Sequence, residues 1–280
     1  MKDQKTCLIT GATSGIGKAA ALELARLGMQ IIFSARDTEK ARITRDEIIQ
    51  LTGNMDIHWY HCDLASFESV KEFSDEVKKN HERLDILINN AGVWMYNKII
   101  TVDGIEYTFQ VNHLAPFLLT HLLSDMIPVS GSGRIINVSS GIQALGYIDI
   151  NDPEFKNKHF SSIKAYGQSK FANILFTREL ANRLKSKNIT VNCLAPGWVN
   201  TGLFRSSGSV VKLSARLGAL TPAMGAETTI YLATSEEVKN ISGEYFSKKR
   251  VTRSAKKSYN TDLMKKLWEL SEIYVKDYLS

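Results

Sequence analysis

Short apolar segments alternate with helix-like segments along nearly the whole chain, and this alternation restricts the possible folds more than any other feature. Several of the apolar segments are hydrophobic at consecutive positions, as expected for strands that are covered on both faces. The strand-like segments are Cys7–Thr10, Gln30–Ala35, Ile57–Cys62, Leu84–Asn89, Arg134–Ser139, Thr190–Ala195 and Glu244–Ser247. The helical patterns between them are Ile16–Leu27, Thr38–Leu51, Phe67–His81, Val102–Met126, Tyr166–Lys185 and Pro222–Thr234. This order predicts right-handed strand–helix–strand crossovers and an α/β sheet.

A glycine-rich loop distinguishes between the two architectures that fit this alternation, an open doubly wound sheet and a closed (β/α)₈ barrel. The loop, TGATSGIG at residues 10–17, follows the first predicted strand and opens the first predicted helix. Gly11 permits a tight turn, Gly15 lets the backbone approach a pyrophosphate, and Gly17 lets the helix pack closely on the sheet. The phosphates would then lie at the positive end of the helix dipole. The alternative is an ordinary strand-to-helix turn, but the position of the loop favours dinucleotide binding.

The chain shows no linker, repeat or low-complexity tract, which favours a single domain. We therefore predict a single-domain, Rossmann-type, doubly wound parallel sheet. Residues 1–247 would form the dinucleotide-binding and catalytic part. Residues 248–280 would add a basic segment and a C-terminal amphipathic helix to the same domain. The expected apolar stripe of that helix is Leu263, Met264, Leu267, Leu270, Ile273 and Tyr274.

The positive net charge arises from one short segment. The chain of 280 residues has 35 Lys and Arg against 29 Asp and Glu, a formal net charge of +6. Residues 248–257 hold six basic residues and no acidic ones, so the rest of the chain is balanced. The charge therefore does not indicate a nucleic-acid partner. We expect a solvated loop there, with a patch facing anions or a membrane surface as the alternative.

The small, odd number of cysteines indicates a reducing compartment. The three cysteines, Cys7, Cys62 and Cys193, are too few for a disulfide framework and are expected to be buried in strands. We expect a cytoplasmic protein without a signal peptide or transmembrane helix. His58 and His61 would leave a strand on opposite faces, and no other residues have ligand spacing, so no metal site is predicted.

The end of the second predicted strand bears on the choice between NADP and NAD. An acidic residue at this place is typical of NAD binding and a basic one of NADP binding. The chain has Arg36 followed by Asp37. Arg36 could bind the 2′-phosphate of NADP through charge-assisted hydrogen bonds, with Ser34 close by. A shift of one residue would place the Asp37 carboxylate there instead, so NAD stays possible and NADP is favoured.

Tyr166 and Lys170 are spaced so that their side chains share one face of a helix. A nearby ammonium favours the tyrosinate, which would lower the pKa of the phenol from its reference value of about 10. Tyr245 and Lys249 have the same spacing, but on a predicted strand that runs into a loop they would lie far apart. Context therefore selects Tyr166 as a candidate acid and base.

The chain resembles the short-chain dehydrogenase/reductase family over roughly residues 5–247. Six segments carry the resemblance in order: TGATSGIG at 10–17, Asp63-Leu64, Asn89–Gly92, Ser139-Ser140, Tyr166 with Lys170, and Pro196–Thr201. The long segment between Ser140 and Tyr166 is similar to that of the retinol-dehydrogenase-like subgroup. Members of that subgroup often carry an N-terminal membrane anchor, and none is expected here.

The resemblance implies a role for each matching residue. Tyr166 would be the catalytic acid and base, Lys170 would lower its pKa and bind the nicotinamide ribose, and Asn112 would hold a water in a proton relay. Adjacent strand residues face opposite sides, which leaves both Ser139 and Ser140 open. The family pattern favours Ser140 as the group that stabilises the substrate oxygen. The implied cofactor-binding residues are Gly11, Thr13, Ser14, Gly15, Ile16, Gly17, Arg36, Asp63, Leu64, Asn90, Ala91, Gly92, Tyr166, Lys170, Pro196, Gly197, Val199 and Thr201.

The expected function is an NADP(H)-dependent oxidoreductase that acts on a small apolar carbonyl or alcohol. The candidate pocket segments, Val93–Tyr96, Ile142–Tyr147 and Trp198–Leu220, contain few charged residues. The alternative is a dinucleotide-sensing or scaffold protein of the same fold without turnover. The family resemblance also implies a homodimer or homotetramer.

Overall fold

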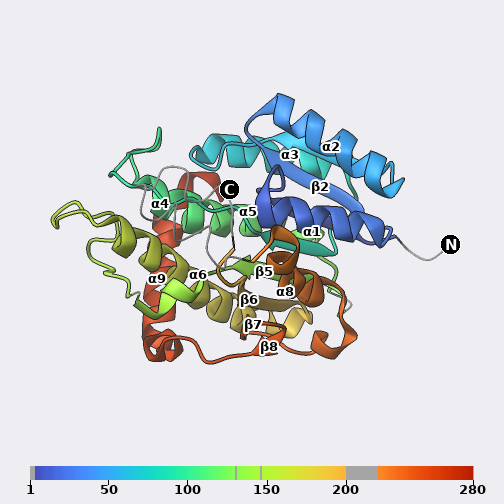
Figure 1. Cartoon of the computed structure of the whole chain (residues 1–280). Coiled ribbons are helices and arrows are strands. Elements are labelled where there is room, and N and C mark those ends of the chain that lie inside the picture. Colours follow the sequence, from blue (N-terminus) through green and yellow to red (C-terminus); the bar gives the residue numbers. More distant parts are fainter. Residues whose placement is uncertain (1–3, 130, 146, 200–219, 280) are drawn as a thin grey trace.

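The computed structural model describes residues 4–129, 131–145, 147–199 and 220–279. Its centre is one sheet with the strand order β3-β2-β1-β4-β5-β6-β7-β8 (Figure 1). All neighbouring strands are parallel except β7 and β8. The strands are β1 (Thr6–Thr10), β2 (Gln30–Ala35), β3 (Ile57–His61), β4 (Ile86–Asn89), β5 (Arg134–Val138), β6 (Thr190–Ala195), β7 (Tyr245–Ser247) and β8 (Arg250–Val251).

Helices cover both faces of the sheet, which confirms the doubly wound prediction (Figure 1). One hydrophobic cluster joins the sheet to α3, α5, α6 and α9, and a second joins it to α1, α2 and α8. Within β1, Leu8 belongs to the first cluster and its neighbours Cys7 and Ile9 to the second, as alternation along a strand requires. The helices are α1 (Gly15–Arg26), α2 (Thr38–Thr52), α3 (Phe67–Asn80), α4 (Tyr107–Phe109), α5 (Ala115–Leu123), α6 (Ser162–Leu184), α8 (Pro222–Thr234) and α9 (Thr261–Val275).

The helix predicted over Val102–Met126 is wrong in its first part. Gly104 has φ +77°, a left-handed conformation that belongs to a turn, and the helix begins only at Tyr107. A π-helical turn, Gln110–Leu114, then separates α4 from α5, with the Ala115 amide donating to the Gln110 carbonyl. Pro116 has no amide hydrogen to continue the α-helical pattern at this point. The helix predicted to start at Tyr166 begins four residues earlier, at Ser162.

The segment 248–257 is more structured than the expected solvated loop. Lys248 and Lys249 both have positive φ, 50° and 62°, and form the turn between β7 and β8. Two positive φ values in a two-residue turn match the right-handed twist of a hairpin. The Lys249 ammonium pairs with the Glu227 carboxylate on α8 at 2.8 Å. The short strand β8 carries no apolar alternation that could have predicted it.

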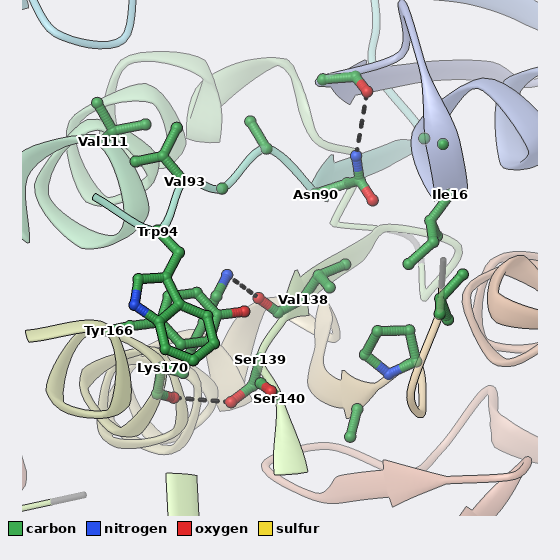
Figure 2. A pocket seen from close by; sticks show the side chains of 18 of the residues that line it. Ile16, Asn90, Val93, Trp94, Val111, Val138, Ser139, Ser140, Tyr166 and Lys170 are labelled. Carbon is green, nitrogen blue, oxygen red and sulfur yellow. Dashed lines mark hydrogen bonds between the residues drawn. The ribbon is translucent and has the colours of Figure 1, made fainter. Parts of the chain in front are cut away.

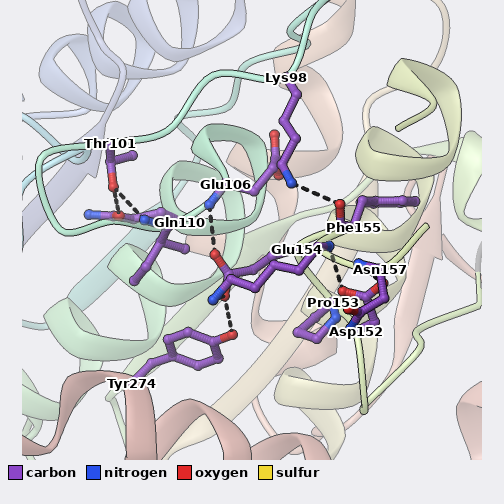
Figure 3. Close-up of polar contacts among 12 residues, drawn as sticks. Lys98, Thr101, Glu106, Gln110, Asp152, Pro153, Glu154, Phe155, Asn157 and Tyr274 are labelled. Atoms are coloured by element: carbon purple, nitrogen blue, oxygen red, sulfur yellow. Dashed lines mark hydrogen bonds and ion pairs between the residues drawn. The ribbon is translucent and has the colours of Figure 1, made fainter. Parts of the chain in front are cut away.

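A buried carboxylate network fixes the long segment before α6 (Figure 3). The Glu154 carboxylate accepts hydrogen bonds from the Glu106 amide at 3.1 Å and from the Tyr274 hydroxyl at 2.6 Å. It also pairs with the Lys156 ammonium at 2.8 Å. The Glu106 carboxylate caps α4 by accepting from the amides of Thr108 and Phe109. These contacts join the segment to α4 and to α9.

Helix α9 buries a face that differs from the predicted stripe. Met264 and Leu267 are buried as expected, but Ile273 is 66% exposed, and Trp268 and Val275 are buried instead. The centroid of the Trp268 indole lies 4.9 Å from the centroid of the Phe117 ring. We therefore propose that residues 248–280 belong to the same folding unit as the sheet.

Trp268→Ala is expected to lower the free energy of unfolding by about 3–5 kcal/mol, because it leaves a large cavity between α9 and the core. Ile273→Ala on the exposed face of the same helix should change it by less than about 0.5 kcal/mol. Urea unfolding monitored by circular dichroism measures both. Equal effects, or a separate transition for α9, would contradict the proposed single unit.

Candidate active site

A cavity of about 1080 Å³ lies at the carboxyl ends of the parallel strands. It brings together most of the predicted site residues, although they are far apart in the sequence. The predicted residues that line it are Gly11, Thr13, Ser14, Gly15, Ile16, Gly17, Arg36, Asp63, Leu64, Asn90, Ala91, Gly92, Ser140, Tyr166, Lys170, Pro196, Gly197 and Val199. Asn112 lies behind this wall. Thr201 lies outside the described residues, as do the predicted pocket residues Leu203, Phe204, Leu213 and Leu217.

The glycine loop packs so closely that side chains cannot replace Gly11 and Gly17. Gly11 has φ +70°, and a Cβ atom there would lie 2.9 Å from the Cα of Ala91. A Cβ atom on Gly17 would overlap the carbonyl oxygen of Gly11 and the side-chain amide of Asn90. That amide donates to the Thr10 carbonyl at 2.8 Å and ties the loop to the end of β4. The loop therefore leaves room for an extended anionic ligand beside the start of α1, as a dinucleotide requires.

Arg36 and Asp37, the two candidates at the end of β2, face different surroundings. The Arg36 guanidinium lines the cavity and donates to the Tyr107 hydroxyl at 3.0 Å. The Asp37 carboxylate caps α2, where it accepts from the Lys40 amide at 3.0 Å and pairs with the Lys40 ammonium at 2.7 Å. Of these two charged residues, Arg36 lies in the cavity wall and Asp37 does not.

Asn112 holds the backbone that follows β4. It lies in the π-helical turn and is fully buried. Its side-chain oxygen accepts from the Val93 amide at 2.7 Å, and its nitrogen donates to the Val93 carbonyl and the Ser169 hydroxyl, both at 2.9 Å. These contacts fix the wall of the cavity next to Gly92, where a Cβ atom would lie 2.9 Å from the Lys170 nitrogen.

The two serines after β5 differ in what their hydroxyls contact. The Ser139 hydroxyl is buried and donates to the Lys170 carbonyl at 2.7 Å, so its proton is already used within the fold. The Ser140 hydroxyl accepts only a long hydrogen bond, 3.4 Å, from the Ile142 amide, and it also interacts with the Tyr166 phenol. Of the two, Ser140 has the hydroxyl placed to reach a molecule beside Tyr166.

Tyr166 and Lys170 lie on one face of α6, as their spacing predicts, and both are almost fully buried. The Lys170 nitrogen lies 5.8 Å from the centre of the Tyr166 ring and donates to the Val138 carbonyl at 3.0 Å (Figure 2). Burial lowers the pKa of the Lys170 ammonium to about 8. Burial also raises the pKa of the Tyr166 phenol to about 12, although the hydrogen bond with Ser140 lowers it in part. The prediction of a phenol pKa below 10 is therefore wrong for the protein alone, because desolvation outweighs the hydrogen bond with Ser140.

Comparison with known proteins decides the family. The profile of the short chain dehydrogenase family matches residues 5–211. Human retinol dehydrogenase 13 is 41% identical over 272 residues, which cover 94% of this chain and 82% of that protein. The chain belongs to the short-chain dehydrogenase family. Its sequence places it with the retinol-dehydrogenase-like members.

Solved structures agree with this assignment. An uncharacterised protein of Mycobacterium paratuberculosis matches 98% of this chain and 94% of its own, with a TM-score of 0.80 and 29% identity. A short-chain dehydrogenase of Escherichia coli CFT073, solved in complex with NADPH, matches 87% of this chain and 96% of its own, with a TM-score of 0.68 and 25% identity.

In this short-chain dehydrogenase the indole of Trp94 covers the Tyr166 ring (Figure 2). The two rings are stacked, with 4.8 Å between their centroids and 2° between their planes. Apolar lining residues continue from this stack, among them Val93, Met95 and Val111. Trp94 thus excludes water from one side of the phenol and contributes to the burial that raises its pKa.

Sequence reasoning missed several cavity residues of this dehydrogenase. Tyr107 contacts Arg36, and Tyr245 contacts the Ser140 carbonyl at 3.5 Å, but neither tyrosine was predicted to belong to the site. Thr252 and Arg253 also line the cavity and come from the segment that was expected to be solvated. The place of β8 on the same side of the sheet as β5 and β6 could not be inferred without the strand order.

Three further findings concern metal binding, membrane-spanning helices and the cysteines in the described part of the chain. No group of three or more His, Cys, Asp and Glu in the described part of the chain is arranged to hold a metal ion. None of the helices in this part is long and apolar enough to cross a membrane. All three cysteines are buried, as expected.

Proposed function

We propose that this protein is an NADP(H)-dependent oxidoreductase that transfers hydride between the nicotinamide ring and a hydrophobic carbonyl or alcohol. The observation that carries the proposal is the single cavity in which the glycine loop and Arg36 lie at one end and Ser140, Tyr166 and Lys170 lie further along. Bound NADP(H) would supply the hydride. The NADPH bound to the Escherichia coli relative and the names of the retinol dehydrogenases support this assignment.

Tyr166 would act as the acid that protonates the substrate oxygen during reduction. A phenol with a pKa of about 12 keeps its proton at neutral pH, which is the form that an acid requires. Ser140 would donate a hydrogen bond to the same oxygen and stabilise the negative charge that develops on it. Lys170 is held by the Val138 carbonyl beside the phenol, where its positive charge favours the tyrosinate left after proton transfer.

The cavity wall around Tyr166 favours an apolar substrate. Trp94 stacks on Tyr166, and Val93, Met95, Ile142 and Trp198 also line the cavity. Pockets of this kind bind small molecules mainly through hydrophobic contact and use a few polar groups to orient them. The carbonyl would therefore be held by Ser140 and Tyr166, and the rest of the molecule by the apolar wall.

Arg36→Leu is expected to weaken NADPH binding by about 10–100-fold, because charge-assisted hydrogen bonds to the 2′-phosphate contribute roughly 1.5–3 kcal/mol. NADH lacks this phosphate, so its affinity should change by less than about threefold. Fluorescence titration measures both affinities. Arg42→Leu on the exposed face of α2, where Arg42 pairs with Glu39, is the matched control. If Arg36→Leu lowered the affinities for NADPH and NADH equally, Arg36 would not be the residue that favours NADP.

A further inference from the structure

The cavity has a second basic end, formed by the segment that follows β8. Thr252 and Arg253 both line the cavity. The Thr252 amide donates to the Tyr245 carbonyl at 2.8 Å, and the Ala255 amide donates to the side-chain oxygen of Gln143 at 3.1 Å. These two hydrogen bonds fix the backbone on both sides of Arg253. The backbone of Arg253 is therefore held in the cavity wall without a contact from its own side chain.

This end lies beyond the reaction centre, away from the cofactor loop. Arg36 follows β2, Ser140 follows β5 and Arg253 follows β8. In the strand order of the sheet, β5 is three strands from β2 and three from β8. At about 4.8 Å per strand, each interval is roughly 14 Å across the sheet. Because β8 runs antiparallel to β7, Arg253 also lies back along the strand direction, next to Thr252, which is opposite the first residue of β7. Ser140 and Tyr166 thus lie near the middle of a cavity that has an arginine towards each end.

Contacts connect Arg253 to the reaction centre along the wall. The Tyr245 hydroxyl lies 3.5 Å from the Ser140 carbonyl, and the Tyr245 carbonyl binds the Thr252 amide. Arg253 is the next residue. A ligand that contacts Ser140 can therefore extend past Tyr245 to Arg253 without leaving the cavity.

The positive charge of Arg253 has no negatively charged partner among the described residues. Arg253 is exposed, and its guanidinium makes no hydrogen bond or ion pair with any described residue. Among the described residues that line the cavity, the only carboxylate is that of Asp63, which follows β3 at the other end. Lys249 of the same basic segment, in contrast, pairs with Glu227. A guanidinium stays charged at every physiological pH and binds a carboxylate through two parallel hydrogen bonds.

We propose that Arg253 is a substrate-binding residue that binds a carboxylate at the far end of the substrate. The substrate class is then an oxo acid: a carbonyl that lies beside Ser140 and Tyr166, an apolar chain along the wall, and a terminal carboxylate on Arg253. This inference rests on the proposed oxidoreductase function. A single guanidinium matches the single charge of a carboxylate, whereas a phosphate would bring a second charge that no other described cation at this end of the cavity wall balances.

The test compares ω-oxodecanoate with its methyl ester as substrates in the presence of NADPH. The wild-type protein should have a KM for the acid at least about tenfold lower than for the ester, as expected for a charge-assisted hydrogen bond. Arg253→Ala should remove this difference by raising KM for the acid alone, with kcat little changed, and Arg253→Lys should retain part of it. Arg250→Ala, an exposed cation of the same segment outside the cavity wall, should behave like the wild type. Equal KM values for acid and ester in the wild type, or an equal effect of Arg253→Ala on both, would overturn the proposal.

Binding without turnover separates this proposal from the proposed function. Isothermal titration of the NADP⁺ complex with decanoate, which has no carbonyl to reduce, should show binding that methyl decanoate lacks and that Arg253→Ala abolishes. If decanoate binds in this way but no aldehyde is reduced, the carboxylate site stands and the oxidoreductase function is wrong. If the ester is reduced but decanoate binds no better than methyl decanoate, the function stands and the carboxylate site is wrong.

Discussion

Tyr166→Phe is expected to lower kcat for the reduction of an apolar carbonyl by about 10²–10⁴-fold, because it removes the proton donor to the substrate oxygen. The substitution keeps the ring, its burial and its stack on Trp94. NADPH affinity should therefore stay within about threefold of the wild-type value. Stopped-flow measurement of NADPH oxidation, combined with fluorescence titration of NADPH, gives both quantities.

The cavity contains a second tyrosine that serves as a matched control. Tyr245 is also buried in the cavity wall, and burial raises the pKa of its phenol to about 12. Its hydroxyl contacts the Ser140 carbonyl rather than the Ser140 hydroxyl. Tyr245→Phe should lower kcat by less than about tenfold, the effect of one weak hydrogen bond. Similar losses in the two variants would show that Tyr166 has no special role in proton transfer.

Lys170→Met should reduce activity and increase stability. Lys170 is 3% exposed, and the one described hydrogen bond of its ammonium goes to the Val138 carbonyl. We expect kcat/KM to fall by about 10²–10⁴-fold, because the variant lacks the charge that stabilises the tyrosinate. Removing a buried, incompletely paired charge stabilises the folded state, and losing the hydrogen bond to Val138 offsets part of this gain. The net increase in the free energy of unfolding should be about 1–2 kcal/mol. Urea unfolding of the cofactor-free protein measures the stability, and Lys164→Met, an exposed position on α6, is the control.

The stability difference between Lys170→Met and the wild type should depend on pH. The pKa of Lys170 falls from 10.5 to about 8 on burial, so below pH 8 the ammonium is charged in both the folded and the unfolded protein. Between about pH 8 and 10.5 the unfolded state binds more protons, so the stability of the wild type rises with pH relative to the variant. The advantage of the variant should therefore be largest below about pH 8 and shrink above it. An advantage that does not change with pH would indicate that Lys170 is not desolvated as described.

Much of the fold follows from local sequence patterns. The apolar segment Gln30–Ala35 and the helix Pro222–Thr234 coincide with β2 and α8, because their ends carry clear signals such as Pro222 at a helix start. The π-helical turn before Pro116 and the buried Trp268 on α9 were missed. The turn contains Asn112, whose side chain binds Val93, and Trp268 packs against Phe117, which lies far away in the sequence.

Site residues could be predicted from the sequence where a single short segment contains the whole motif. The glycine loop and the Tyr166–Lys170 spacing are local, and the structure places both in the cavity wall. The choices between Ser139 and Ser140 and between Arg36 and Asp37 needed the direction of each side chain, which the structure provides. The raised pKa of Tyr166 and the presence of Arg253 in the wall depend on tertiary burial and strand order, which no local pattern contains.

The central claim is that the cavity performs hydride transfer, and isotope transfer tests it most directly. The protein is incubated with NADPH that carries deuterium at the transferable position of the nicotinamide ring, together with a panel of apolar aldehydes and ketones. Mass spectrometry of the alcohols should show deuterium on the former carbonyl carbon, in an amount equal to the cofactor oxidised, and Tyr166→Phe should suppress it. Tight binding of NADPH without any deuterated alcohol would contradict the claim and indicate a dinucleotide-sensing or scaffold protein instead.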